Sequence, residues 1–241
     1  MAFSLFISDL HLSPDTPAAT DTLLRFLRDT APQAESLYVL GDLFEYWIGD
    51  EGLAQPYAKH VAQALRATTD SGVRTYFMHG NRDFLIGERF AQASGLQLLP
   101  DPTFVDLHGT PTVLMHGDTL CSDDHEYQKF RAMVRNPAWQ QAFLAKPLDE
   151  RVRIAREVRG KSEHAKQVKD MTIMDVTPAS VDDALRAHRY ARLIHGHTHR
   201  PARHEHTVDG HRCERWVLAD WYDHGSYLMC DASGCGFQSL A

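Results

Sequence analysis

Short apolar runs alternate with amphipathic segments along most of the chain. The runs are rich in β-branched and aromatic residues, a composition that favours strands. Strands are expected at residues Phe3–Ser8, Leu37–Leu40, Val73–Met78, Phe104–Leu107, Thr112–Met115 and Arg192–Ile194, with a last pair near Arg215–Ala219 and Ser226–Cys230. Helices are expected at residues Pro17–Thr30, Gln55–Asp70, Gly87–Ala93 and Pro178–His188. This alternation predicts a layered α/β fold, and because no repeat or linker interrupts it, residues 1–241 are expected to form a single domain.

Residues 125–170 depart from this alternation. Their apolar residues recur at helical spacing, and Pro137 and Pro147 mark breaks between helices. The stretch Lys129–Asp170 holds 11 Lys and Arg against 5 Asp and Glu, a net charge of +6, whereas the other residues carry −13. We therefore expect a basic helical insertion in an acidic α/β body. The simplest interpretation is a solvated subdomain packed on the body, and a functional role needs further support.

Composition limits the classes of function. The net charge of −7 over 241 residues argues against a nucleic-acid binder, and no feature predicts a protein partner. The four cysteines form no C-x-x-C pair, so reduced thiols in a cytosolic protein are expected. The N-terminal residues lack the pattern of a signal peptide, and no apolar run approaches the roughly 18 residues of a membrane span. Any membrane contact is expected to be peripheral.

Five polar motifs follow apolar runs, each at the end of an expected strand. Because the carboxyl ends of strands in an α/β sheet meet at one edge, we expect these motifs to converge. They are Asp9-Leu10-His11, Gly41-Asp42, Gly80-Asn81-Arg82-Asp83, His116-Gly117-Asp118 and His195-Gly196-His197-Thr198-His199.

The side chains of these motifs have the chemistry of metal ligands. The candidate ligands are Asp9, His11, Asp42, Asn81, His116, His197 and His199. Carboxylate, imidazole and amide ligands without thiolate suit Mn, Fe, Zn or Mg. Seven ligands are too many for one tetrahedral ion but fit two ions about 3.5–4 Å apart that share a carboxylate, and Asp42 is the expected bridge. An extended D-x-H segment would place Asp9 and His11 on the same side.

Each motif alone is weak, but their order resembles the calcineurin-like metallophosphoesterase superfamily. This resemblance implies a four-layered α/β/β/α sandwich with a dinuclear centre, in which a metal-activated water attacks phosphorus. It also implies two ligand sets, with Asp42 in both. One ion would be held by Asp9, His11, Asp42 and His199, and the other by Asp42, Asn81, His116 and His197.

Two positions differ from the superfamily pattern. Glu45 stands where many members have the second Asp of G-D-x-x-D, and Arg82 stands where G-N-H-[DE] has His. Arginine is a poor general acid but binds phosphate oxygens with its planar fork. Arg82 therefore favours a leaving group that needs little protonation, such as a phosphate monoester with a second pKa of about 6. The alternative is a surface arginine, or one paired with Asp83.

Longer segments resemble one family within that superfamily, the pyrophosphatases of lipid A biosynthesis. They are FISDLHL, LYVLGDLFEYWIGD, MHGNRDFLIG, VLMHGDTLC and LIHGHTHRPA. The resemblance implies two Mn²⁺ per chain and attack on the α-phosphorus of UDP-2,3-diacylglucosamine, which gives UMP and 2,3-diacylglucosamine 1-phosphate (lipid X). Asn81 and Arg82 would be catalytic. Contacts to the substrate would come from Asn81, Arg82, Asp124, Ser162, Lys166, Lys169 and His197.

On this interpretation residues 125–170 form a lid that encloses the acyl chains, and the protein works in the cytoplasm, peripherally on the inner face of a bacterial inner membrane. Two alternatives remain open. A phosphodiesterase or pyrophosphatase for a soluble nucleotide would not need an apolar lid. A metal-free scaffold for protein interactions would have no use for the intact ligand set.

Overall fold

The computed structural model describes residues 2–168, 175–222 and 225–240, with the backbone alone for 161–168. Its first sheet has the strand order β11-β10-β1-β2-β3-β4. Strands β1 to β4 run parallel, and β10 and β11 add an antiparallel edge. The strands are β1 (Ser4–Ile7), β2 (Ser36–Val39), β3 (Arg74–Met78), β4 (Gln97–Leu99), β10 (Ser226–Asp231) and β11 (Gly234–Ser239).

The second sheet has the order β5-β6-β7-β9-β8. Strands β6, β7 and β9 are parallel, so their carboxyl ends share one edge, while β5 and β8 pair antiparallel at the two sides. The strands are β5 (Thr103–Leu107), β6 (Thr110–Met115), β7 (Arg192–His195), β8 (Ala202–Val208) and β9 (His211–Val217).

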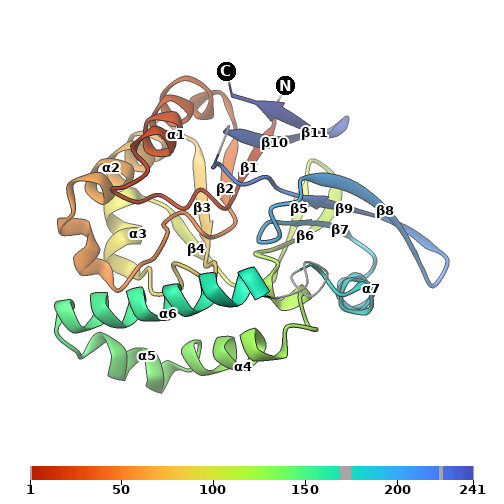
Figure 1. Cartoon of the computed structure of the whole chain (residues 1–241). Helices are drawn as coiled ribbons and strands as arrows, with labels where there is room; N and C mark the ends of the chain where they lie inside the picture. The colour runs from red at the N-terminus through yellow and green to blue at the C-terminus, as the bar shows by residue number, and fades with distance from the viewer. Residues whose placement is uncertain (1, 169–174, 223–224, 241) are drawn as a thin grey trace.

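Helices cover the outer faces of both sheets (Figure 1). The first sheet is covered by α1 (Pro17–Asp29), α2 (Pro56–Asp70) and α3 (Glu88–Ser94), and the second by α7 (Pro178–Ala187). Short 3₁₀ turns lie at η1 (Ala31–Gln33), η2 (Asp50–Ala54) and η3 (Asp118–Leu120). The expected four-layered α/β/β/α sandwich is confirmed.

The alternation of side chains along the strands builds these layers. In β1, Leu5 and Ile7 join the core beneath α1 to α3, whereas Phe6 points into the core between the two sheets. In β7, Leu193 packs under α7 and Ile194 joins the core between the sheets. Because both faces of the central strands are buried, these strands are mostly apolar, which explains why short apolar runs were a good signal for them.

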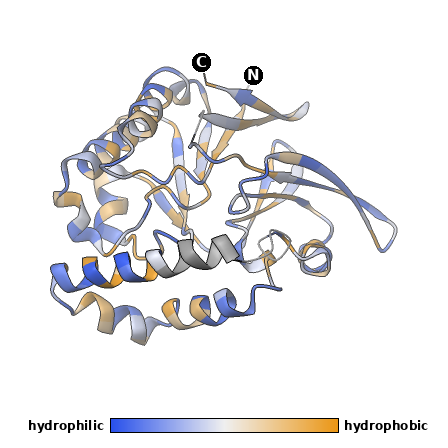
Figure 2. Cartoon of the chain, in the orientation of Figure 1, coloured by the Kyte–Doolittle hydropathy of each residue, from blue (hydrophilic) through white to orange (hydrophobic). Residues whose placement is uncertain are grey.

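Three further helices form the stretch that the sequence marks as an insertion. They are α4 (His125–Val134), α5 (Pro137–Leu144) and α6 (Leu148–Val168), which lie together below the sheets in Figure 1. The predicted breaks are confirmed, since α5 begins at Pro137 and α6 begins directly after Pro147. In the coloured, N-terminal part of α6, hydrophilic and hydrophobic residues alternate along the helix (Figure 2). None of the helices that the structure describes is long and apolar enough to cross a membrane.

Sequence patterns missed three strands and one cross-link. The short β4 and the edge strands β8 and β11 were not expected, because edge strands carry polar residues on their open side. The stretch RHEHTVDGHR, which looks like an exposed hairpin connection, is in fact mostly strand, with exposed and half-buried residues alternating along β8. Cys230 and Cys235 face each other across β10 and β11 and form a disulfide, contrary to the expected reduced thiols.

Asp50 ties the loop after β2 to the first turn of α3. Its Oδ1 accepts hydrogen bonds from the Trp47 indole (3.1 Å) and the Gly87 N–H (2.9 Å). Its Oδ2 accepts from the N–H groups of Arg89 (2.9 Å) and Phe90 (3.1 Å). A carboxylate that satisfies several N–H groups at a helix start is stabilising through both hydrogen bonding and the helix dipole.

Replacing Asp50 with Ala is expected to lower the free energy of unfolding by about 1–3 kcal/mol, because four N–H donors, three of them in part-buried hydrogen bonds, lose their acceptor. Urea unfolding followed by circular dichroism measures this change. The exposed Asp29, which pairs with the neighbouring Arg28 in solvent, supplies the control, and Asp29→Ala should leave stability nearly unchanged. Equal stability of the Asp50 and Asp29 variants would refute this role.

Candidate metal centre

The five motifs converge where the carboxyl ends of the two sheets meet. Backbone hydrogen bonds hold their loops side by side. The Asp9 N–H donates to the Gly41 carbonyl at 3.1 Å, and the Gly196 N–H donates to the His116 carbonyl at 2.8 Å. The expectation that strand ends bring distant motifs together is therefore confirmed by the geometry.

Asp9, His11 and His199 form the first half of the centre. The Nε2 atoms of His11 and His199 lie 3.3 Å apart, and His199 Nε2 lies 3.4 Å from Asp9 Oδ1. One ligand atom from each of the three residues falls within 4.8 Å of the other two. This half matches three of the four ligands expected for one ion.

Asn81, His116 and His197 form the second half. Asn81 Oδ1 lies 3.0 Å from His116 Nε2 and 2.8 Å from His197 Nδ1. Between the halves stands Asp42, whose Oδ2 is 3.9 Å from His11 Nε2 and whose Oδ1 is 3.8 Å from His116 Nε2. A carboxylate with one oxygen toward each half could bridge two ions.

These side chains fit metal ions rather than one another. Two ligands at right angles around an ion with bonds of about 2.1 Å lie about 3 Å apart, close to the spacings found here. The two carboxylate oxygens of Asp9 differ in their hydrogen bonding. Its Oδ2 accepts from the Ser8 hydroxyl (2.6 Å) and the His197 N–H (2.9 Å), whereas its buried Oδ1 has no hydrogen-bond partner among the described residues. A buried carboxylate oxygen without a hydrogen bond is costly, and a cation would satisfy it.

The charges of the centre also favour the binding of cations. Burial opposes charging of His116, but the carboxylates of Asp42, Asp118 and Asp9 outweigh it and raise the His116 pKa to about 9. Burial lowers the pKa of His197 to about 4, and repulsion from His116 adds to this. The carboxylates thus favour positive charge at the position of His116, and a bound cation would supply that charge, with the ring deprotonated to act as a ligand. The excess of buried negative charge favours cations at this position.

The ligands reach the centre through tight turns, not through an extended chain. The backbone φ is positive at Asp9 (56°), His11 (49°), Asp42 (53°), His197 (70°) and His199 (55°). The expectation that Asp9 and His11 share one side of an extended segment is therefore wrong. Positive φ is unfavourable for these residue types, and such strain clusters at functional sites where the surrounding structure holds it.

Glycines in the motifs provide space for the carboxylates. A Cβ on Gly80 would stand 2.1 Å from Asp42 Oδ1, and a Cβ on Gly196 would stand 2.3 Å from Asp9 Oδ2. Either contact would displace the carboxylate. The glycine of G-N is thus required by a close approach to Asp42.

Asp83 supports both metal loops, a role that sequence reasoning missed. Its Oδ1 accepts from the N–H groups of Gly80 (2.9 Å) and Asp42 (3.3 Å), and its Oδ2 accepts from the Leu43 N–H (2.7 Å). Burial, together with the nearby Asp42 carboxylate, raises the pKa of Asp83 to about 7, although the backbone donors oppose the shift. Gly80 and Asp83 stand only three positions apart, and this spacing gives no hint that Asp83 also binds the loop after β2.

Arg82 lies at the mouth of the centre beside Glu45. Its side chain is only 14% exposed, and Nη1 lies 3.3 Å from Glu45 Oε1. Glu45 also contacts His11 Nδ1 at 3.4 Å and Arg159 Nε of α6 at 3.3 Å. Arg82 is therefore neither a surface arginine nor paired with the Asp83 carboxylate, which binds backbone N–H groups instead.

The loop after β9 contributes two residues that the sequence did not reveal. Asp220 Oδ2 lies 3.4 Å from His199 Nδ1, a carboxylate placed to orient an imidazole ligand. The ring of Tyr222 stacks on His11 with centroids 5.2 Å apart. Strand β9 runs parallel to β7 and so brings this loop to the same edge of the sheet as the motifs. Recognising that orientation would have pointed to both residues.

The expected substrate contacts outside the motifs are placed only in part. Asp124 caps α4, its Oδ1 accepting from the Tyr127 N–H at 3.1 Å. Ser162 and Lys166 belong to α6, but their side chains lie outside the described residues, as does Lys169 altogether.

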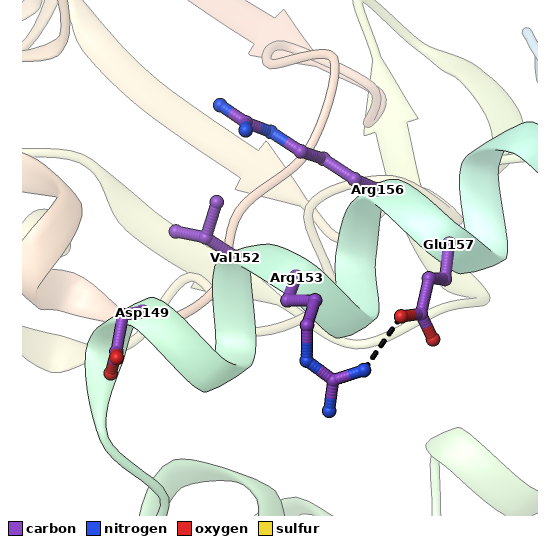
Figure 3. A pocket seen from close by; sticks show the side chains of 5 residues that line it. All are labelled: Asp149, Val152, Arg153, Arg156 and Glu157. Atoms are coloured by element: carbon purple, nitrogen blue, oxygen red, sulfur yellow. Dashed lines mark hydrogen bonds and ion pairs between the residues drawn. The ribbon is translucent and has the colours of Figure 1, made fainter.

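A separate hollow of about 500 Å³ lies on α6, away from the metal centre. It is lined by Asp149, Val152, Arg153, Arg156 and Glu157. Val152 and Arg156 point to one side of the helix, and Arg153 and Glu157, joined by a hydrogen bond, point to the other (Figure 3). The hollow is therefore a feature of the helical insertion alone.

Asp83→Asn is expected to weaken Mn²⁺ binding by about 10–100-fold, because an amide NH₂ would face backbone donors and displace the Asp42 or Asn81 loop. Calorimetric titration of chelator-treated protein measures the dissociation constant. Asp29→Asn on the surface serves as the control. Wild-type affinity in the folded Asp83 variant would contradict the supporting role.

Comparisons with known proteins agree with this geometry. The family model described as calcineurin-like phosphoesterase matches residues 4–201. The chain is 51% identical to the UDP-2,3-diacylglucosamine hydrolase of Aromatoleum aromaticum over 231 residues, which cover 96% of this chain and 94% of the relative. It is 49% identical to the enzyme of the same name from Stenotrophomonas maltophilia, over 99% of this chain and 98% of the relative. A third hydrolase of this name, from Edwardsiella ictaluri, is 51% identical over 96% of this chain and 89% of its own length.

Identity at this level along almost the whole chain leaves the assignment plain: the protein belongs to the calcineurin-like phosphoesterases, within the family of the UDP-2,3-diacylglucosamine hydrolases.

Proposed function

We propose that this protein hydrolyses the pyrophosphate bond of UDP-2,3-diacylglucosamine at the α-phosphorus and releases UMP and 2,3-diacylglucosamine 1-phosphate (lipid X) in lipid A biosynthesis. The observation that carries the proposal is the identity of about half of all residues with hydrolases of this name, over nearly the full chain. The intact metal centre and Arg82 provide independent chemical support.

The proposed ligands of the first ion are Asp9, His11, Asp42 and His199, and those of the second are Asp42, Asn81, His116 and His197. Two Mn²⁺ ions, when bound, would supply an activated water and charge stabilisation for attack on phosphorus. The chain's own part is to hold these ligands rigidly. Asp83, the motif glycines and the strained turns provide that rigidity.

Arg82 and Asn81 have the proposed catalytic roles at the phosphates. Arg82 would bind phosphoryl oxygens with its guanidinium, stabilising negative charge without giving up a proton. Glu45 holds this guanidinium at 3.3 Å in a position facing the centre. A proton donor is unnecessary because the departing group is itself a phosphate monoester. Asn81 and His197 would contact the phosphates from the second half.

Residues 125–170 are proposed as the lid within the single domain of residues 1–241. Arg151 of α6 donates to the Ile48 carbonyl at 2.6 Å, and Phe143 of α5 is buried in the core beneath the first sheet's helices. The insertion nevertheless keeps apolar side chains in solvent, namely Met133, Leu144, Leu148 and Val158. An apolar and basic surface beside the centre suits acyl chains and phosphates, with Asp124, Ser162, Lys166 and Lys169 as proposed contacts. A soluble nucleotide would need no such surface.

The same surface supports peripheral binding to the cytoplasmic face of the inner membrane. The segment Lys129–Asp170 carries a net charge of +6, and anionic lipids attract such clusters. Exposed Leu144 and Leu148 lie close to each other in sequence at the turn between α5 and α6. We infer that the lid meets the lipid surface from which the substrate is taken.

Asp42→Ala is expected to lower turnover of UDP-2,3-diacylglucosamine by at least about 10³-fold with the fold retained, because the carboxylate between the two halves is lost. Release of UMP is measured by chromatography with Mn²⁺ present, and circular dichroism checks the fold. Near-wild-type turnover by the purified variant would contradict the proposed metal centre. Absence of turnover by the metal-loaded wild type would contradict the proposed function itself.

Arg82→His is expected to lose about 10²–10³-fold in turnover while metal content stays at the wild-type level, because only phosphate stabilisation is removed. Elemental analysis gives the metal content. A gain of activity on alkyl phosphomonoesters would support the leaving-group argument, since the new imidazole can donate a proton. Loss of bound metal in this variant would contradict the role given to Arg82.

A further inference from the structure

Tyr222 presents an open aromatic face beside the first half of the metal centre. Its ring lies parallel to that of His11, with an interplanar angle of 4° and centroids 5.2 Å apart. It also lies 5.7 Å from the His199 ring in a tilted arrangement. Yet the residue is 57% exposed, the largest exposure among the exposed large hydrophobic residues of the described chain.

The chain around Tyr222 fixes this orientation. The preceding Trp221 is buried, its N–H donates to the Asp9 carbonyl at 3.2 Å, and its indole donates to the Ser226 carbonyl at 2.9 Å. Asp220 contacts His199, as described above. With both preceding residues held by the centre, Tyr222 is presented at the mouth by a well-anchored stretch of loop.

Tyr127 provides a useful contrast on the second half. Its ring stacks on His197 with centroids 5.9 Å apart, and its hydroxyl donates to Asp118 at 2.5 Å. Tyr127 is half-buried and pairs with the buried Asp118 between α4 and η3, so its packing explains its presence. Tyr222 stacks on His11 and is nevertheless 57% exposed, so core packing does not explain it.

Tyr222 does not belong to the helical insertion. The proposed contacts to the lipid end of the substrate, Asp124 among them, belong to α4 and α6, whereas Tyr222 comes from the loop after β9. The two ends of a pyrophosphate substrate must leave the centre in different directions. Tyr222 thus adds an aromatic surface beside the first half of the centre that does not come from the insertion.

We propose that the open face of Tyr222 stacks on the uracil ring of the nucleotide half of the substrate. This inference rests on the proposed function. Uracil is the one planar aromatic group of UDP-2,3-diacylglucosamine, since the sugars are saturated rings and the acyl chains are flexible. Stacking of a base on an aromatic side chain is favourable and needs only a free face. Tyr222 thereby acts as a binding and specificity residue for the nucleotide.

Product binding tests this assignment directly. Calorimetric titration of the Mn²⁺-loaded protein compares UMP with ribose 5-phosphate, which keeps the phosphate and sugar but lacks the base. Tyr222→Ala should weaken UMP binding about tenfold and leave ribose 5-phosphate binding unchanged. Tyr222→Phe should bind UMP like the wild type, because it keeps the ring. Phe104→Ala removes an aromatic ring of similar exposure on β5 and should change neither ligand.

Kinetics with UDP-2,3-diacylglucosamine provides a second measurement. Tyr222→Ala should raise KM about tenfold with kcat retained, since the ring binds the nucleotide and does not touch the reacting phosphorus. Wild-type UMP affinity in Tyr222→Ala would overturn the inference, and so would equal weakening of both ligands, which would indicate a disturbed metal centre. If the wild type hydrolyses the lipid substrate, such a result overturns the stacking role alone. A wild type that neither binds UMP nor hydrolyses the substrate overturns the proposed function as well.

Discussion

Two carboxylates buried between two sheets impose the constraint on which the rest of this structure depends. Asp9 has no exposure and Asp42 is 2% exposed, and burying charges in this way is unfavourable unless cations or hydrogen bonds compensate. One oxygen of Asp9 and both oxygens of Asp42 face imidazoles across gaps of 3.4–3.9 Å. The strained turns, the glycines without room for a Cβ and the backbone clamp of Asp83 all maintain this geometry. They make sense as the supports of a dinuclear metal centre.

The sequence predicted those strands and ligand residues whose place in the fold leaves a local pattern in the sequence. Strands buried on both faces are apolar runs, and ligands at their carboxyl ends must meet, so the layers and the convergence of the seven ligand candidates were accessible. Asp83, Asp220 and Tyr222 were not, because each acts across loops whose proximity depends on the pairing of strands. Likewise β8 pairs only at one side, so its polar alternation resembled a loop. The turn geometry at Asp9 and His11 was misjudged, since D-x-H spacing fits a strand and a tight turn equally well.

The surroundings of the centre explain how a general hydrolytic site becomes selective. Arg82, held by Glu45, has the proposed role of binding phosphoryl oxygens when a phosphate is the leaving group. Arg159 of α6 shares Glu45 with Arg82, which links the insertion to this proposed phosphate contact. In the proposed binding mode, the apolar and basic insertion would take the lipid, Arg82 the phosphates and Tyr222 the base.

In the proposed reaction, water attacks the phosphorus attached to uridine and the lipid phosphate leaves. Hydrolysis of UDP-2,3-diacylglucosamine by the Mn²⁺-loaded protein in ¹⁸O-labelled water, followed by mass spectrometry of both products, shows which phosphorus is attacked. We expect one ¹⁸O atom in UMP and none in 2,3-diacylglucosamine 1-phosphate. Label in the lipid product would contradict it, because water would then have attacked the other phosphorus and UMP would have been the leaving group.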